Sequence, residues 1–234
     1  MSRDPGRVPL RAVLFDMDGT LTDSEKLWTI ALERLAVELG GTMSAQARAA
    51  MVGKPIGPAI ALLHADLGIE RDAAASTARL MELTGEVFRA GMPWRPGARE
   101  LLADVRAAGL ATALVTATYR SLVEIALETL GRDNFDVTVC GDEVTRGKPH
   151  PDPYLRAMEL LDVAAPNSLA VEDSPTGTRA AELAGVAVLV VPSEVPVPPG
   201  PARAFAPTLA SMTADSLRTI HAEFGAGDWV GVQS

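Results

Sequence analysis

The stretch that decides the fold is Phe15-Asp16-Met17-Asp18-Gly19-Thr20-Leu21, which follows the short apolar run Ala12-Val13-Leu14. This run is too short for a helix and predicts a strand, so the two aspartates lie where a strand ends. Ligands of parallel α/β sheets collect at the carboxyl ends of strands, and residues two apart on an extended backbone point to the same side. We therefore expect Asp16 and Asp18 to face one substrate, with Gly19 allowing a sharp turn after them.

Two neighbouring carboxylates repel each other unless a cation lies between them, which predicts a Mg2+ site. The same letters also occur in plain surface turns and at the start of calcium-binding loops. A calcium loop counted from Asp16 needs glycine at its sixth position and glutamate at its twelfth, where this chain has Leu21 and Leu27. The calcium interpretation therefore fails, and the choice between a turn and a metal site depends on the rest of the chain.

Three further polar positions stand out: Thr116 after the apolar run 111–115, Lys148 just before Pro149, Pro151 and Pro153, and the pair Glu172-Asp173 after the apolar run 168–171. The Thr116 hydroxyl and the free N–H groups of a following helix could hold phosphate oxygens. Prolines stiffen the loop around Lys148, as a charge clamp requires. The adjacent acids at a third strand end again indicate a metal.

Taken together, these blocks resemble the four motifs of the haloacid dehalogenase-like hydrolase superfamily in order and spacing. The matching residues are Asp16-Met17-Asp18-Gly19-Thr20, Thr116, Gly147-Lys148-Pro149 and Glu172-Asp173-Ser174. The resemblance covers roughly residues 10 to 220. Dehalogenases proper lack the second aspartate, so Asp18 indicates the branch of β-phosphoglucomutases and sugar-phosphate phosphatases, which carry a helical cap.

Hydrophobic periodicity predicts an α/β fold, a doubly wound parallel sheet with an inserted α-helical cap. Apolar runs near 11–15, 111–115, 135–139, 168–171 and 186–191 alternate with amphipathic segments, as in such a sheet. From about Thr22 to Met92 the pattern is helical throughout. We therefore assign 10–21 and 93–225 to the catalytic core, 22–92 to the cap, and 1–9 and 226–234 to flexible termini.

Composition and net charge indicate a globular protein that does not bind nucleic acid or membranes. The chain has 234 residues, of which 47% are hydrophobic, enough for a substantial core. Its net charge of −9 opposes binding to nucleic acid or anionic membranes, and its single cysteine, Cys140, excludes an internal disulfide. No signal-peptide core or long apolar span is visible. We expect a cytoplasmic monomer whose partner is a small-molecule phosphate ester.

The resemblance also implies roles for the motif residues. Asp16 is the nucleophile that becomes an aspartyl-phosphate, and Asp18 protonates the leaving alcohol and then activates water. Thr116, Ala117 and Lys148 hold the phosphate oxygens.

The implied cofactor is Mg2+, held by Asp16, the main-chain carbonyl of Asp18, and Asp173. Glu172 is either a further metal ligand or an acceptor that holds Lys148 or a metal-bound water, and we favour the second role. Lys54 could reach the substrate from the cap, although an exposed lysine there is more often solvated.

Two alternatives to a phosphatase are considered. Sugar phosphomutases of this branch carry a histidine twelve residues after the nucleophile, where this chain has Trp28. If Gly53 is their cap glycine, their phosphate-binding arginine is replaced by Ile56. Segment 23–28 looks more like sugar-phosphate phosphatases, which favours hydrolysis. A regulatory phospho-acceptor domain shares the acidic pocket but needs neither Asp18 as a general acid nor a lid.

Overall fold

The computed structural model describes residues 8–52 and 54–224. Their strands form one parallel six-stranded sheet in the order β3-β2-β1-β4-β5-β6. The strands are β1 (Ala12–Phe15), β2 (Ala111–Val115), β3 (Val137–Val139), β4 (Ser168–Glu172), β5 (Ala187–Val190) and β6 (Arg203–Phe205).

Strand β1 lies inside the sheet, paired with β2 on one side and β4 on the other. Phe15, the last residue of β1, is in register with Leu114 and Val171. The segments that follow these three strands therefore leave the sheet at the same edge, where ligands of such sheets bind.

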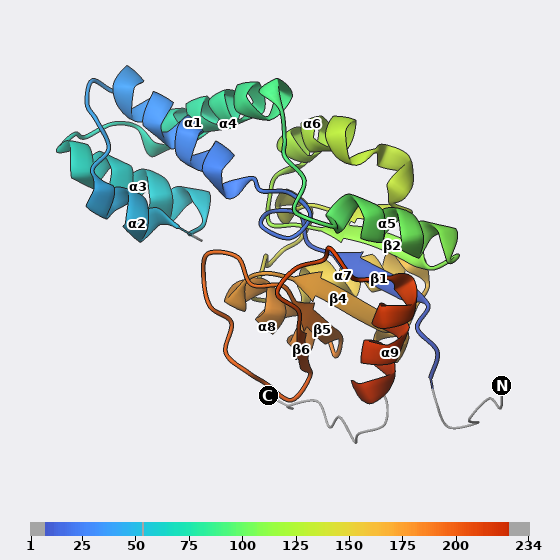
Figure 1. Ribbon diagram of the computed structural model, residues 1–234. Helices are drawn as coiled ribbons and strands as arrows, with labels where there is room; N and C mark the ends of the chain where they lie inside the picture. The colour runs from blue at the N-terminus through green and yellow to red at the C-terminus, as the bar shows by residue number, and fades with distance from the viewer. Residues whose placement is uncertain (1–7, 53, 225–234) are drawn as a thin grey trace.

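Helices cover both faces of the sheet and also form a separate unit beside it (Figure 1). The helices are α1 (Glu25–Glu38), α2 (Ala45–Met51), α3 (Ile56–Leu67), α4 (Ala73–Ala90), α5 (Ala98–Ala107), α6 (Arg120–Leu130), α7 (Asp152–Leu161), α8 (Pro175–Leu183) and α9 (Ala214–Phe224). Short 3-10 helices span Arg132–Asn134, Gly141–Glu143 and Ala165–Asn167.

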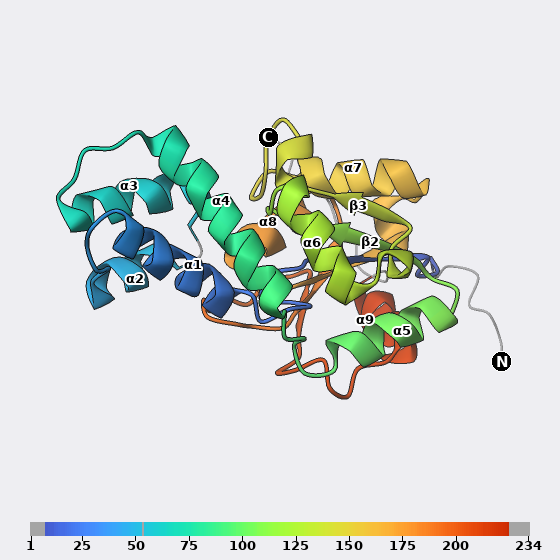
Figure 2. The same cartoon turned by 90° about the horizontal axis from the view of Figure 1, so that it is seen from above.

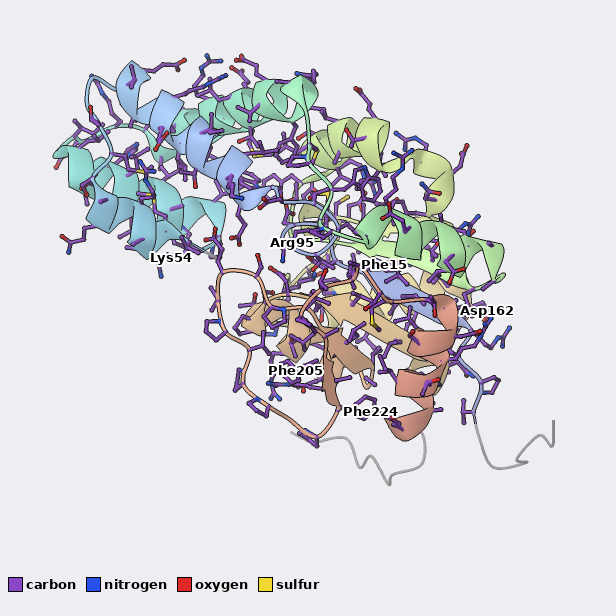
Figure 3. All side chains as sticks on the ribbon, viewed as in Figure 1. Phe15, Lys54, Arg95, Asp162, Phe205 and Phe224 are labelled. Carbon is purple, nitrogen blue, oxygen red and sulfur yellow. The ribbon has the colours of Figure 1, made fainter. Side chains whose placement is uncertain are left out.

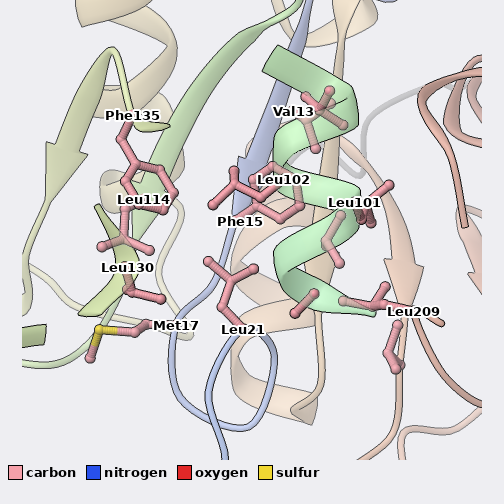
Figure 4. Packing of buried hydrophobic residues seen from close by; sticks show 14 of the residues in the cluster. Val13, Phe15, Met17, Leu21, Leu101, Leu102, Leu114, Leu130, Phe135 and Leu209 are labelled. Carbon is pink, nitrogen blue, oxygen red and sulfur yellow. The ribbon is translucent and has the colours of Figure 1, made fainter. Parts of the chain in front are cut away.

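The side chains of β1 alternate between two hydrophobic cores, as the pleat of a strand requires. Val13 and Phe15 pack with α5, α6 and α9, whereas Ala12 and Leu14 pack with α7 and α8. Figure 4 shows Phe15 beside Leu102 of α5. Every residue of β1 is buried, which is typical of a strand in a covered parallel sheet.

Helices α1 to α4 form the inserted unit, with a hydrophobic cluster of their own. The chain enters and leaves this unit through two adjacent segments. Thr22 forms an isolated bridge with Trp94, and the Arg95 N–H donates to the Leu21 carbonyl at 2.9 Å. Helix α4 packs against α6 of the core, and the two lie side by side in Figure 2.

The predicted fold class is confirmed, but β6 was not predicted. It lies at the sheet edge, has only three residues, and ends in Phe205, which is 45% exposed. Such a strand carries no apolar run, and the proline-rich segment 192–201 before it indicated only an extended connection.

The assigned domain boundaries stay a prediction. Most of the predicted flexible N-terminus, 1–7, and all of the predicted flexible C-terminus, 226–234, lie outside the described residues. No helix in the described ranges is long and apolar enough to cross a membrane.

Candidate active site

Asp16 follows β1 at the carboxyl edge of the sheet and is held there by Lys148. The Lys148 ammonium donates to Asp16 Oδ1 at 2.6 Å, to Glu172 Oε1 at 2.6 Å and to the Val115 carbonyl at 2.8 Å. The Lys148 side chain is only 5% exposed. A lysine is buried at this depth only when its charge is paired, and here two carboxylates pair it.

Glu172 ends β4 and uses both carboxylate oxygens. Its Oε1 accepts from Lys148 and from the Tyr154 hydroxyl at 2.7 Å, while Oε2 accepts from Ser174 Oγ and the Asp173 N–H, each at 3.2 Å. Tyr154 on α7 is fully buried, and its ring lies 5.2 Å from the Lys148 nitrogen. This arrangement favours Glu172 as the residue that orients Lys148.

Three buried carboxylates, those of Asp16, Glu172 and Asp173, offer oxygens within 4.8 Å of one another. Gly19 makes this approach feasible, because a Cβ at that position would lie 2.1 Å from Asp173 Oδ2. Its φ of 79° also favours glycine. Hard oxygen donors at this spacing are the ligands that Mg2+ prefers.

The electrostatics of the cluster fit a divalent cation. Burial raises the pKa of Asp16 to about 7; Lys148 opposes this rise, and Glu172 and Asp18 add to it. Burial, followed by the charges of Asp16 and Glu172, raises the pKa of Asp173 to about 9. Burial lowers the pKa of Lys148, but Asp16 and Glu172 outweigh it and hold that pKa above its ordinary value. When all three are ionised, these carboxylates carry more negative charge than the one Lys148 ammonium neutralises.

Asp18 lies apart from these contacts and is surrounded by hydrogen-bond donors. Its Oδ1 accepts from Ser24 Oγ at 2.6 Å and lies 3.5 Å from the Trp28 indole nitrogen. Its Oδ2 accepts from Thr118 Oγ1 at 2.7 Å and Thr116 Oγ1 at 3.2 Å. The Asp18 carboxylate is not in the acidic cluster, and the predicted metal contact through its main-chain carbonyl stays a prediction.

The remaining predicted residues lie at different distances from this centre. Ala117 sits in the loop after β2, directly beside Thr116. Lys54 is exposed between α2 and α3, at the edge of the helical unit (Figure 3), and its side chain makes no ion pair with the described residues. Gly53, the candidate cap glycine, lies outside the described residues.

Sequence reasoning missed Ser24, Thr118 and Tyr154, and it placed Trp28 near the site only by analogy. Serine and threonine are common in loops, and a tyrosine on an amphipathic helix looks like an ordinary core residue. The one available signal was that Thr118 follows Thr116 by two residues at a strand end, the spacing that links Asp16 to Asp18. His64 on α3 is buried and hydrogen-bonded to Ser76 at 2.9 Å.

The sequence profile of the haloacid dehalogenase-like hydrolases matches residues 13–191. The chain belongs to this family. It is 35% identical over 181 residues to a phosphorylated carbohydrates phosphatase of Thermotoga maritima, covering 76% of this chain and 82% of that protein. It is 32% identical over 200 residues to hexitol phosphatase A of Escherichia coli, covering 80% and 86%.

Among solved structures, the fold is similar to CbbY from Rhodobacter sphaeroides in complex with phosphate. The TM-score is 0.75 with 28% identity, and the match covers 86% of this chain and 96% of that one. The resemblance to haloacid dehalogenase-like hydrolases and the predicted enzyme class, a phosphoric monoester hydrolase of this family, are therefore confirmed.

Proposed function

We propose that this family member is a Mg2+-dependent phosphatase that hydrolyses a small phosphate monoester, a sugar phosphate or a similar metabolite, through an aspartyl-phosphate on Asp16. The observation that carries this proposal is the Asp16 carboxylate, fixed by Lys148 at 2.6 Å beside two further buried acids. The Thermotoga and Escherichia relatives, named for phosphorylated carbohydrates and hexitols, support the substrate class.

The side chains of Asp16 and Asp18 can carry out ester hydrolysis in two steps. A carboxylate oxygen of Asp16 attacks phosphorus, the bond to the ester oxygen breaks, and its electron pair leaves with the alcohol oxygen, which takes a proton from Asp18. Asp18 then removes a proton from the water that attacks the same phosphorus and frees Asp16. Lys148, Thr116 and the Ala117 main chain hold the other phosphate oxygens.

Asp16, Asp173 and the Asp18 carbonyl would hold Mg2+, whose charge offsets the repulsion between the Asp16 carboxylate and the anionic ester. Glu172 would orient Lys148 from behind. Cytoplasmic location and a monomeric state, both expected from the sequence, stay predictions.

Hydrolysis is favoured over phosphomutase chemistry because Trp28 stands near Asp18, where the sugar phosphomutases of this branch carry a histidine. Incubation with a hexose 1-phosphate and a catalytic amount of the bisphosphate, followed by phosphorus NMR, separates the two. We expect inorganic phosphate. Accumulation of the 6-phosphate with little free phosphate would identify a mutase.

The test of the proposed function is a screen of phosphate esters for Mg2+-dependent phosphate release, ranked by kcat/KM.

Asp16→Asn should lower turnover at least roughly a thousandfold, because an amide cannot attack phosphorus. Retention of about a tenth of the wild-type turnover would refute the nucleophile assignment. Repeated turnover also excludes the phospho-acceptor alternative, since such a domain keeps its phosphate.

A further inference from the structure

Thr118 makes the shortest contact between the core and the Asp18 carboxylate. Its hydroxyl lies 2.7 Å from Asp18 Oδ2, against 3.2 Å for Thr116. Thr118 is 6% exposed, so its hydroxyl has little access to water as an alternative partner. The opposite oxygen, Oδ1, is held by Ser24 at 2.6 Å. The carboxyl group is therefore fixed from both sides.

The loop that carries Thr118 is itself held in place. The Thr118 N–H donates to Thr116 Oγ1 at 3.0 Å, and the Thr118 carbonyl accepts from the Gly141 N–H at 3.0 Å. A Cβ on Gly141 would lie 2.1 Å from the Ala117 carbonyl oxygen, so the two loops are in close contact. This backbone framework fixes the Thr118 Cα and Cβ, so only the χ1 angle, which is restricted in a β-branched residue, remains to place the hydroxyl.

The chemistry of the partners differs between the two aspartates. Asp16 is held by an ammonium, which can only donate and so favours the ionised carboxylate. Asp18 is held mainly by hydroxyls, which donate to a carboxylate and accept from a protonated carboxyl. Hydroxyl partners suit a group that must carry a proton in one half-reaction and lose it in the other.

We propose that Thr118 is a positioning residue that holds the Asp18 carboxyl group where it transfers its proton to the leaving alcohol. This inference rests on the proposed phosphatase function and adds to it a residue outside the four motif blocks. The Thr118 hydroxyl makes the contact with Asp18, whereas the Thr118 N–H and carbonyl bond to Thr116 and Gly141. The positioning role is therefore assigned to the side chain.

Leaving-group dependence tests the proposal. The enzyme is compared on p-nitrophenyl phosphate, whose leaving group needs no proton, and on sorbitol 6-phosphate or whichever alkyl ester the screen ranks first. Thr118→Val keeps the side-chain shape and removes the hydroxyl, and Thr118→Ser restores it. Because kcat/KM reports only steps up to the first irreversible one, it isolates phosphorylation of Asp16.

We expect Thr118→Val to lower kcat/KM for the alkyl ester by about ten- to a hundredfold, which is part of what a general acid contributes. For the aryl ester, whose leaving group needs no proton, we expect kcat/KM to fall by less than about threefold. Thr118→Ser should return the alkyl value to within about threefold of wild type, and inhibition by inorganic phosphate should be unchanged. With the aryl ester, Thr118→Val should release a burst of nitrophenolate as Asp16 is phosphorylated. A slow phase should follow, because the attack of water on the aspartyl-phosphate still needs Asp18 as a base.

Equal losses on both esters would overturn the proposal and leave Thr118 a structural residue. A weaker inhibition constant for inorganic phosphate with the same loss on both esters would make it a phosphate-binding residue instead. Activity on the aryl ester shows that the variant is folded. If wild-type enzyme releases no phosphate, the proposed function itself fails, which is a different result.

Discussion

At the scale of single residues, the site depends on a buried ammonium shared by two acids. Lys148 contacts both Asp16 and Glu172 at 2.6 Å with almost no exposure to solvent. Removing one partner of a buried ion pair leaves the other charge uncompensated and typically costs about 3–5 kcal/mol. The cost depends on pH, because a buried carboxylate without its cation can take up a proton instead.

Lys148→Met should therefore destabilise the metal-free protein more at pH 8.5 than at pH 6. Without the ammonium the pKa of Asp16, already raised to about 7, rises further. A raised folded-state pKa means that stability is lost as pH climbs from the unfolded value toward the folded one. Thermal unfolding at both pH values measures this. Lys26→Met, which breaks an exposed pair, is the control. The same loss at both pH values for Lys148→Met would contradict the description of the site.

The motif residues could be placed from sequence because strand ends in a parallel sheet meet at one edge, so Asp16, Thr116 and Glu172 had to lie close together. The contact between Glu172 and Lys148, favoured from the resemblance, is present at 2.6 Å. The contact of Glu172 with Tyr154 could not be predicted, because it depends on side-chain directions from α7 and β4. Thr118 and Ser24 carry no pattern that separates them from ordinary loop residues.

At the scale of elements, the contact between α4 and α6 connects the helical unit with the core. Gly85 lies buried in the middle of α4, and a Cβ there would lie 3.0 Å from Ile125 Cδ1 and 3.6 Å from Leu122 Cδ2. Glycine inside a helix costs roughly 1 kcal/mol relative to alanine. Its presence here is explained by the close approach of the two helices.

Gly85→Leu should lower the free energy of unfolding by about 1–3 kcal/mol, because a bulky side chain has no space between α4 and α6. Gly85→Ala should change it by less than about 1 kcal/mol, since the gain in helix propensity opposes a slight contact with the flexible end of Ile125. Urea denaturation of both variants measures the difference. A leucine variant as stable as wild type would show that the helices separate easily.

The existence of the long helices and of strands β1 to β5 could be predicted because each has a clear period or apolar run. The end of α1 at Glu38 follows from Gly40 and Gly41, where the apolar pattern stops. The packing of α4 on α6 could not be predicted, since periodicity shows that a face is apolar but not what covers it. The short edge strand β6 lacks even that signal.

At the scale of the whole molecule, an acidic protein has to concentrate positive charge at one point to bind an anionic ester. The net charge is −9, and the described acidic cluster has Lys148 as its ion-paired cation. Burial and mutual repulsion raise the pKa of Asp16 to about 7 and that of Asp173 to about 9. In the absence of a divalent cation, these two acids contribute a loss of stability as pH rises from about 4 to 9.

Mg2+ should raise the melting temperature, and the increase should grow between pH 6 and pH 9, because the cation competes with protons for the same oxygens. At a hundredfold excess over Kd the gain is about 2.7 kcal/mol, roughly 5 °C or more for a protein of this size. Chelation should remove the increase, and Asp173→Asn should both abolish it and make the chelated protein more stable at pH 8.5. An increase that is independent of pH, or that persists in the variant, would contradict the cluster as the metal site.

If Asp16 is the nucleophile, it carries the phosphoryl group during turnover, and that group can be found on the protein. Asp18→Asn is mixed with p-nitrophenyl phosphate and Mg2+ and quenched in acid, and its peptides are mapped by mass spectrometry. The aryl ester needs no acid to form the intermediate, and without the Asp18 carboxylate water attacks slowly. We predict a single phosphoryl group on the peptide that contains Asp16, absent when Asp16 is also changed to Asn. Release of nitrophenolate with no label on any peptide, or with the label on another residue, would show that Asp16 is not the nucleophile.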